Sequence, residues 1–380
     1  MEKVIPNIQM VDLKGQYHNI KAEVDQSLRE VIDSCAFING PKVKSFKASM
    51  ESYLGAKYVI PCGNGTDALQ IAMMALDMPQ GAEVIVPAFT YVATAEVIAL
   101  LGFKPVMVDV DPHTFNITPE IVEAAITPNT KAIVPVHLFG QSCDMAPIQA
   151  LAAKHNLWVI EDNAQAIGAD YTYPDGKVVK TGLLSHIGGT SFYPSKNLGA
   201  YGDGGALYTN DDVLGPKLQI IANHGQVKRY YHDFVGVNSR LDSFQAAILD
   251  IKLKHLDEYA AARRQAADYY DQAFAGMEDQ LLTPARASYS SHVFHQYTLK
   301  VKTGNRDELQ TYLKENGVPS MIYYPVPLYK QEAYRHQADE NFFLPVTEQL
   351  CQEVISLPMH TELTEEALAY IVDTVKGFFK

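Results

Sequence analysis

The feature that most constrains the fold is a regular alternation of short apolar runs with helix-like stretches, from about residue 58 to about residue 210. The runs are rich in β-branched residues and cover residues 58–62, 83–87, 105–110, 132–138 and 157–162. Continuous apolar strands separated by helices are typical of a parallel sheet that is covered on both faces. The sequence therefore predicts an α/β fold, in which ligands bind at the carboxyl ends of the strands.

Segments outside this region complete the expected architecture. Apolar residues at steps of three and four predict an amphipathic helix over 17–35. The absence of Gly and Pro predicts one long helix over 240–274. Residues 292–301 and 318–327, with a helix near 306–315 between them, predict a smaller α/β domain. The chain of 380 residues is long enough for two domains. We place the large domain with its N-terminal helices at 1–250 and the small one at 251–380.

Charge and composition exclude several classes of protein. The net charge of −13 argues against a general nucleic-acid binder, which needs a basic face. No apolar run approaches the roughly 18 residues of a membrane span, and the N-terminus lacks the apolar stretch of a signal peptide. The four cysteines are scattered and form no CxxC pair, which is typical of free thiols in a reducing compartment. We therefore expect a cytoplasmic protein.

Two candidate sites lie directly after predicted strands. In GNGTDAL, residues 63–69, glycines allow a close backbone approach, and free N–H groups at a helix start attract phosphate. A simple turn with an N-cap explains this motif equally well. Asp162 ends the run 157–162 and could pair with the protonated ring nitrogen of pyridoxal phosphate (PLP), which helps that ring to accept electrons. Taken alone, Asp162 is better explained as the cap of a turn.

A third candidate is Lys196, which follows a β-like run and precedes a glycine-rich stretch. A lysine in such a pocket can lose its proton and form a Schiff base, although a single lysine is more often a surface residue. The glycines over 199–205 fit a tight strand connection better than a phosphate cradle. His292 and His295 would face opposite sides of a predicted strand, so we expect no metal site.

A fourth candidate is a basic cluster in an otherwise acidic chain. It fits either a local anion site or a solvated loop before the long helix. Its members are His224, Lys228, Arg229, His232, Asn238 and Arg240.

Six motifs in the same order resemble the DegT/DnrJ/EryC1/StrS family of sugar aminotransferases. They are GNGTDAL, PAFTYVATAE, VHLFGQ, IEDNAQAIGA, SFYPSKNLGAYGDGGA and GVNSRLDSFQAAIL. The resemblance extends from about Val11 to Met359, which is nearly the whole chain. It implies the PLP-dependent aspartate-aminotransferase fold (type I) and a homodimer whose active sites lie at the subunit interface.

The same resemblance implies a role for individual residues. Lys196 would form the Schiff base with PLP, and Asp162 would bind the pyridine nitrogen. Gln165 would lie near the ring hydroxyl, and Tyr91 would stack on the ring face. Some family members have His in place of this lysine and perform dehydrations, so the retained Lys196 favours amino transfer. The implied phosphate ligands are Gly65, Thr66, Ser191 and, reaching the partner subunit's cofactor, Asn238.

The resemblance further implies glutamate as amino donor and a nucleotide-linked keto-sugar as acceptor. The motifs are most similar to the branch that acts on UDP-linked 2-acetamido-3-keto sugar acids in bacterial lipopolysaccharide and other surface-polysaccharide synthesis. Arg240 would bind the sugar carboxylate at two points, and Ser195, Tyr323 and Tyr324 would add hydrogen bonds. That branch is expected to carry a His-Tyr pair in place of Tyr323-Tyr324. A dTDP-linked 3-keto-6-deoxy sugar therefore stays an alternative acceptor, and a non-catalytic PLP-binding regulator stays an alternative function.

Overall fold

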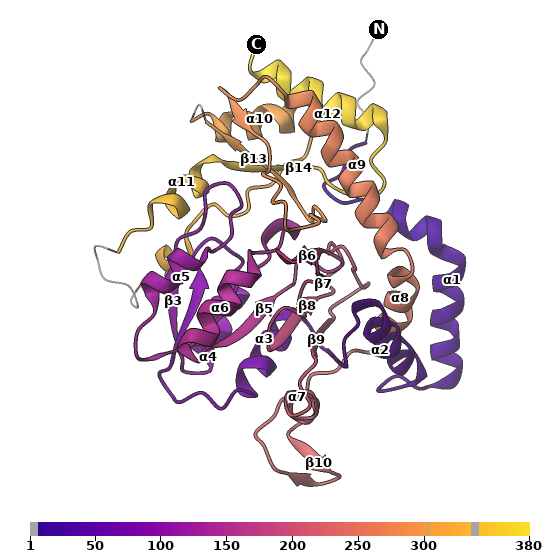
Figure 1. Cartoon of the computed structure of the whole chain (residues 1–380). Helices are drawn as coiled ribbons and strands as arrows, with labels where there is room; N and C mark the ends of the chain where they lie inside the picture. Colours follow the sequence, from indigo (N-terminus) through magenta and orange to yellow (C-terminus); the bar gives the residue numbers. More distant parts are fainter. Residues whose placement is uncertain (1–6, 303, 336–341) are drawn as a thin grey trace.

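The computed structural model describes residues 7–302, 304–335 and 342–380. A large sheet flanked by helices forms one part of the molecule, and a smaller sheet with its own helices lies at the C-terminal end (Figure 1). The segment on which we based the absence of a signal peptide lies partly outside these residues, because residues 1–6 are not described. Within the described ranges, no helix is long and apolar enough to cross a membrane.

The large sheet confirms the expected α/β fold. Its seven strands occur in the order β1-β9-β8-β5-β4-β2-β3, and only β9 runs antiparallel to its neighbours. The reversal arises because a loop over residues 192–204, and no crossover helix, joins β8 to β9. The glycines over 199–204 lie in this strand connection, as expected, but the connection is longer than the tight one that we predicted, and Gly205 begins β9. The strands are β1 (Tyr58–Cys62), β2 (Glu83–Pro87), β3 (Lys104–Val108), β4 (Thr130–Ile133), β5 (Trp158–Asp162), β8 (Ile187–Ser191) and β9 (Gly205–Thr209).

Helices cover both faces of this sheet because alternate strand residues point to opposite sides. Val84 and Val86 of β2 pack with α3, α4 and α7, whereas Ile85 between them packs with α5 and α6. A further cluster joins α2 and α8 to β1 and β9. The helices are α1 (Leu13–Ser34), α2 (Pro41–Leu54), α3 (Gly65–Met74), α4 (Ala93–Leu100), α5 (Pro119–Ala125), α6 (Met145–His155), α7 (Leu214–Ile221) and α8 (Ser243–Leu253).

The prediction of one long helix over 240–274 is wrong. The chain forms α8 and then α9 (Leu256–Phe274), with a break at Lys254 and His255. Helix α8 packs on α1 and α2, whereas α9 packs on α12 (Glu365–Phe378), so the two helices serve different packing partners. The break contains neither Gly nor Pro, so the sequence pattern did not indicate that the helix ends there. The expected helix at 17–35 is α1, which starts earlier because Asp12 accepts a hydrogen bond from Gly15 N.

The C-terminal sheet is smaller and antiparallel, with strands β12 (Leu281–Leu282), β13 (Tyr297–Val301) and β14 (Val354–Leu357). The strand expected over 292–301 begins only at Tyr297, because residues 293 and 296 bond instead to Gly140 and Phe139. Segment 318–327 forms no strand, only an isolated bridge from Met321 to Ser356. The helices here are α10 (Arg306–Glu315), the expected one, and α11 (Pro345–Glu353) besides α12.

Short elements complete the described part of the chain. They are the strand pairs β6 (Asp170–Thr172) with β7 (Val178–Lys180) and β10 (Gln226–Lys228) with β11 (Tyr231–His232), and the 3-10 turns Leu138–Gly140 and Leu328–Lys330. The predicted domain boundary after residue 250 lies within α8 and stays a prediction.

Candidate active site

A cavity of about 820 Å³ opens at the carboxyl ends of the central strands. This is where a mostly parallel sheet is expected to bind its ligand. The wall also includes residues 295–296, just before β13, and residues 321–324, which line the cavity together with Asp162 at the end of β5. Most of the site residues predicted from the sequence line it, namely Gly65, Thr66, Tyr91, Asp162, Gln165, Ser191, Ser195, Lys196, Tyr323 and Tyr324.

Asp162 is the last residue of β5 and is only 5% exposed. Its backbone is bonded on both sides, because Asp162 N donates to Pro135 O and its carbonyl accepts from His137 N. Its carboxylate accepts two further hydrogen bonds, from Ala164 N to Oδ1 at 3.1 Å and from the Thr94 hydroxyl to Oδ2 at 2.7 Å. Two donors on two oxygens hold this negative charge in one orientation at the cavity wall.

One end of the cavity is formed by the first turn of α3. Asn64 caps this helix by accepting from Asp67 N at 2.8 Å, while Gly65 and Thr66 occupy positions whose N–H groups have no partner within the helix. A Cβ atom at Gly65 would lie 2.6 Å from the Cβ of Ser191, so only glycine lets α3 and β8 approach this closely. The free N–H groups and the nearby hydroxyls suit a phosphate group.

Lys196 lies in the loop between β8 and β9 and lines the same cavity as Asp162. Burial lowers the pKa of Lys196 to about 8, although the negative charge of Asp162 acts in the opposite direction. At pH 7, about one tenth of this amine is therefore unprotonated, far more than for a lysine with an ordinary pKa. An uncharged lysine amine is a nucleophile and a base, which an ordinary surface lysine is not.

Aromatic side chains form another wall. Tyr91 is 59% exposed, and its ring centroid lies 6.4 Å from that of Tyr324. The Tyr324 hydroxyl accepts a hydrogen bond from Gln165 Nε2 at 3.2 Å, and Gln165 Oε1 accepts from Phe139 N at 2.7 Å. Gln165 thereby links the large sheet to the segment that carries Tyr324.

Asn238 and Arg240 are not among the residues that line this cavity. The Arg240 guanidinium donates to the side-chain oxygens of Asn238 and Asn223. Between them, the Ser239 hydroxyl accepts from Gly63 N at 2.8 Å and donates to Asp67 Oδ2 at 2.6 Å. The segment is thus fixed next to the start of α3, while the ligands that we predicted for Asn238 and Arg240 stay predictions.

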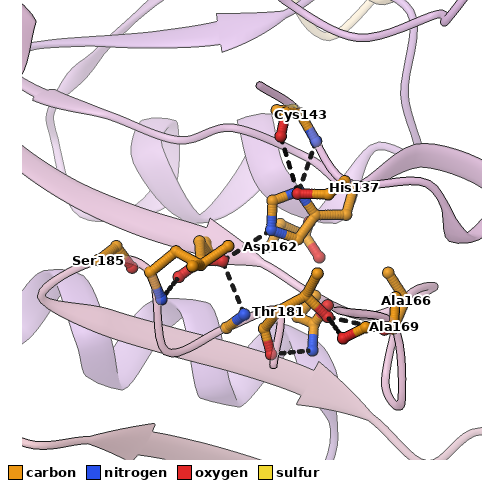
Figure 2. Close-up of polar contacts among 12 residues, drawn as sticks. His137, Cys143, Asp162, Ala166, Ala169, Thr181 and Ser185 are labelled. Carbon is orange, nitrogen blue, oxygen red and sulfur yellow. Dashed lines mark hydrogen bonds and ion pairs between the residues drawn. The ribbon is translucent and has the colours of Figure 1, made fainter. Parts of the chain in front are cut away.

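A buried polar network lies behind Asp162, on the opposite side of β5. Glu161 is fully buried, and its carboxylate accepts from Gly182 N at 2.6 Å, Leu184 N at 2.8 Å and His137 Nε2 at 2.8 Å. His137 Nδ1 accepts from Cys143 N at 3.1 Å, so the proton that donates to Glu161 is on Nε2 (Figure 2). The network ties two loops to the end of the strand that carries Asp162.

Several residues at the site were not predicted from the sequence. Thr94 lies within PAFTYVATAE and is not among the lining residues, but it bonds to Asp162, 68 positions away, and no sequence pattern indicated that contact. His295 and Gln296 do line the cavity. Burial and the positive charges of Lys196 and Arg263 lower the pKa of His295 well below its usual range, so this imidazole is neutral. The expected strand placed His295 wrongly, because residues 292–296 are irregular.

The residues of the cavity fit PLP. The helix start with its close-packed Gly65 suits the phosphate, the partly neutral Lys196 suits the aldehyde, and the fixed Asp162 carboxylate suits the pyridine nitrogen. Tyr91 provides an aromatic surface for the ring. These groups come from different elements and meet at one cavity, as a single cofactor of this shape requires.

Comparisons with known proteins agree with this geometry. The DegT/DnrJ/EryC1/StrS aminotransferase family matches residues 18–376. The chain is 48% identical over 364 residues to the UDP-2-acetamido-2-deoxy-3-oxo-D-glucuronate aminotransferase of Pseudomonas aeruginosa, covering 96% of this chain and 98% of that one. It is also 48% identical over 375 residues to a pleiotropic regulatory protein of Geobacillus stearothermophilus, covering 98% and 99%.

A solved structure shows the same fold with a cofactor in place. NtdA from Bacillus subtilis, with the bound cofactor PMP, superimposes with a TM-score of 0.90 at 31% identity, covering 99% of this chain and 86% of that one.

Proposed function

Because the chain belongs to the DegT/DnrJ/EryC1/StrS aminotransferase family, we propose that it transfers the amino group of glutamate to C3 of a UDP-linked 2-acetamido-3-keto sugar acid. The protein is a PLP-dependent nucleotide-sugar aminotransferase. The observation that supports the proposed amino transfer is that Lys196 and Asp162 line one cavity together with a helix start whose free N–H groups suit a phosphate.

When bound, PLP supplies an electron-accepting ring that stabilises negative charge at the Cα atom of the amino donor. The Asp162 carboxylate would keep the ring nitrogen positively charged, which strengthens that effect. Lys196 Nζ would take the proton from Cα as a general base and later return it as a general acid. Burial lowers the pKa of Lys196 from its ordinary value, which favours the neutral form that can accept a proton. Tyr91 would cover the ring face, and Gly65, Thr66 and Ser191 would hold the phosphate.

The acceptor sugar would lie on the open side of the cavity, toward Ser195, Tyr323 and Tyr324. Their hydroxyls can bond to sugar oxygens. Glutamate, the nucleotide phosphates and a sugar carboxylate are all anions. Among the described residues that line the cavity, however, Lys196 is the only lysine or arginine, and Asp67, Asp162 and Asp203 are acidic. Further cations are therefore needed from outside this chain's own cavity wall.

A second copy of the chain can provide those cations, and we propose a homodimer with shared active sites. The segment from β10 to Arg240 carries Lys228, Arg229 and Arg240. Its hairpin projects beyond α7, away from the rest of the chain (Figure 1), and exposes Tyr230 at 81% and Val235 at 87%. Apolar side chains this exposed support a role in subunit contact. In this arrangement Asn238 and Arg240 act in the partner's site.

The acceptor is tested with purified wild type and Arg240→Ala, each supplied with the UDP-linked sugar acid and with a dTDP-linked 3-keto-6-deoxy sugar. Wild type should prefer the acid, and the variant should lose about 1.5–3 kcal/mol of transition-state binding on the acid alone, as for a hydrogen bond to a charged group. The deoxy sugar lacks the carboxylate and is the internal control. A wild-type preference for the deoxy sugar, or an equal loss on both substrates, would reject the acid.

The name of the Geobacillus relative raises a regulatory role as a second function. A passive PLP binder and an aminotransferase differ in one simple observation. If the protein is an aminotransferase, glutamate should bleach its visible absorbance as the amino group moves to the cofactor. One 2-oxoglutarate should appear for each cofactor converted. An unchanged spectrum would favour the passive binder.

A further inference from the structure

We infer that Thr94 is a positioning residue, which holds the Asp162 carboxylate in the orientation that its contact with the cofactor ring requires. The inference rests on the proposed role of Asp162. It gives a role to Thr94, which had none among the residues predicted from the sequence or among those that line the cavity. Thr94 is the second residue of α4, and its side chain reaches the last residue of β5.

The contact is short, buried and joins distant elements. The Thr94 hydroxyl donates to Asp162 Oδ2 at 2.7 Å, and the two residues are 1% and 5% exposed. Water therefore competes little for either group. A hydroxyl has one proton to donate, and here that proton is committed to the carboxylate.

Other hydrogen bonds already hold the Asp162 backbone and Oδ1, so the Thr94 bond restrains the remaining rotation of the carboxylate plane. The backbone bonds to Pro135 and His137 hold the main chain within the sheet. The Ala164 N–H holds Oδ1 at 3.1 Å, which leaves rotation of the carboxylate restrained on one oxygen only. The Thr94 bond restrains the other. Each oxygen keeps a second lone pair, which is the acceptor that a ring N–H needs.

Loss of the hydroxyl has a defined consequence. In Thr94→Val, the shape of the side chain is nearly unchanged, but Oδ2 becomes a buried carboxylate oxygen without this donor. The carboxylate can then rotate or draw in water, and its contact with the ring weakens. Because the ring contact matters most when charge develops on the ring, turnover should fall more than glutamate binding.

The first experiment measures steady-state kinetics of the holoenzyme with glutamate as amino donor and a nucleotide-linked keto-sugar as acceptor. Thr94→Val should lower kcat by about 10- to 100-fold, the range for a hydrogen bond to a charged group, with little change in KM. Thr94→Ser keeps the hydroxyl and should restore most of the loss. Thr94→Ala provides a second variant without the hydroxyl, and circular dichroism and thermal unfolding establish that each protein is folded.

The matched control is Thr347→Val. Thr347 is fully buried and donates its hydroxyl to Asp109 Oδ1 at 2.7 Å, so it makes the same kind of bond outside the cavity. This variant should lose stability but keep wild-type kcat. If Thr347→Val impaired turnover as much as Thr94→Val, a general loss of stability would explain both results and the inference would fail.

A second readout is independent of turnover. Pyridoxamine phosphate forms no covalent bond to Lys196, so its Kd for the apoprotein reports the ring and phosphate contacts. Thr94→Val should raise this Kd by about 10-fold or more, whereas Thr94→Ser and Thr347→Val should leave it near the wild-type value.

The Asp162→Ala background separates this inference from the proposed function. Asp162→Ala alone should lower turnover by roughly 10²-fold or more, and adding Thr94→Val should cause no further loss, because the hydroxyl acts through that carboxylate. Near-normal turnover of Asp162→Ala would overturn the proposed role of Asp162. If Asp162→Ala lowers turnover strongly, two results would overturn the role of Thr94 alone. One is that the losses caused by Thr94→Val and Asp162→Ala add in the double variant. The other is that Thr94→Val keeps wild-type kinetics and a wild-type Kd.

Discussion

Lys196 and Lys252 show how position decides the chemistry of a lysine. Burial lowers the pKa of each to about 8. Lys252, however, is 1% exposed, donates to Gly199 O at 2.6 Å and does not line the cavity. It is therefore a structural support for the loop that follows Lys196. Lys196 faces the cavity, where its free amine can react.

This difference leads to a prediction at the residue scale. When PLP is added to apoprotein, the rate of covalent attachment should rise with pH and level off above about pH 8, because only the neutral amine reacts and the folded pKa is lowered from its ordinary value of 10.5. Stopped-flow absorbance measures the rate. A lysine with an ordinary pKa would show a rate that continues to rise well above pH 9.

Borohydride reduction followed by mass spectrometry identifies the lysine directly. The adduct should lie on Lys196, and Lys252 serves as the internal comparison with a similarly lowered pKa. Lys196→Ala should show neither the adduct nor turnover. An adduct on Lys252 would mean that the cavity described here is not the cofactor site.

At the scale of elements, the end of β5 presents two carboxylates with different tasks. Asp162 faces the cavity, and Glu161 faces the opposite side, since successive strand residues alternate. Glu161 joins the loops at residues 137–143 and 181–184 through three accepted hydrogen bonds. The conformation of the strand end therefore depends on the buried Glu161 carboxylate, both of whose oxygens accept hydrogen bonds.

Glu161→Gln tests that dependence. The amide places an NH₂ group against donors that expect an oxygen, so the free energy of unfolding should fall by about 1–3 kcal/mol, the cost of unsatisfied buried groups. Urea unfolding of the apoprotein measures it. Glu366→Gln, at an exposed position in the first turn of α12, is the matched control and should change stability little. Equal stability of the two variants would show that the network contributes nothing to the strand end.

At the scale of the whole molecule, the cavity of one chain has too few cations for its anionic ligands, and this predicts a shared site. Light scattering should give a homodimer in solution. Lys196→Ala and Asn238→Ala should each be inactive or strongly impaired, and a mixture of the two, refolded or exchanged together, should regain partial activity. The gain arises because some mixed dimers contain one intact site. A fully active monomer, or a mixture no more active than its components, would contradict the shared site.

The sequence by itself determined five of the seven strands of the large sheet and ten of the residues that line the cavity. The strand signals are local, because a fully buried parallel strand must be a short apolar run bounded by breakers. The site motifs are local as well. GNGTDAL places Gly65 and Thr66 at a helix start, and the run 157–162 places Asp162 at the carboxyl end of its strand. Lys196 was found by its motif, although its lowered pKa depends on burial that no motif reveals.

Only the tertiary structure decided the features that depend on distant packing. The break between α8 and α9 contains no Gly or Pro. It arises because α8 packs on α1 and α2, whereas α9 packs on α12. Residues 292–296 leave the expected strand because their backbone bonds to residues 139–140. The Thr94–Asp162 bond spans 68 positions, and Asn238 and Arg240 turn out to lie outside their own chain's cavity wall. Contacts between residues far apart in sequence leave no periodic or local pattern, so the folded chain alone reveals them.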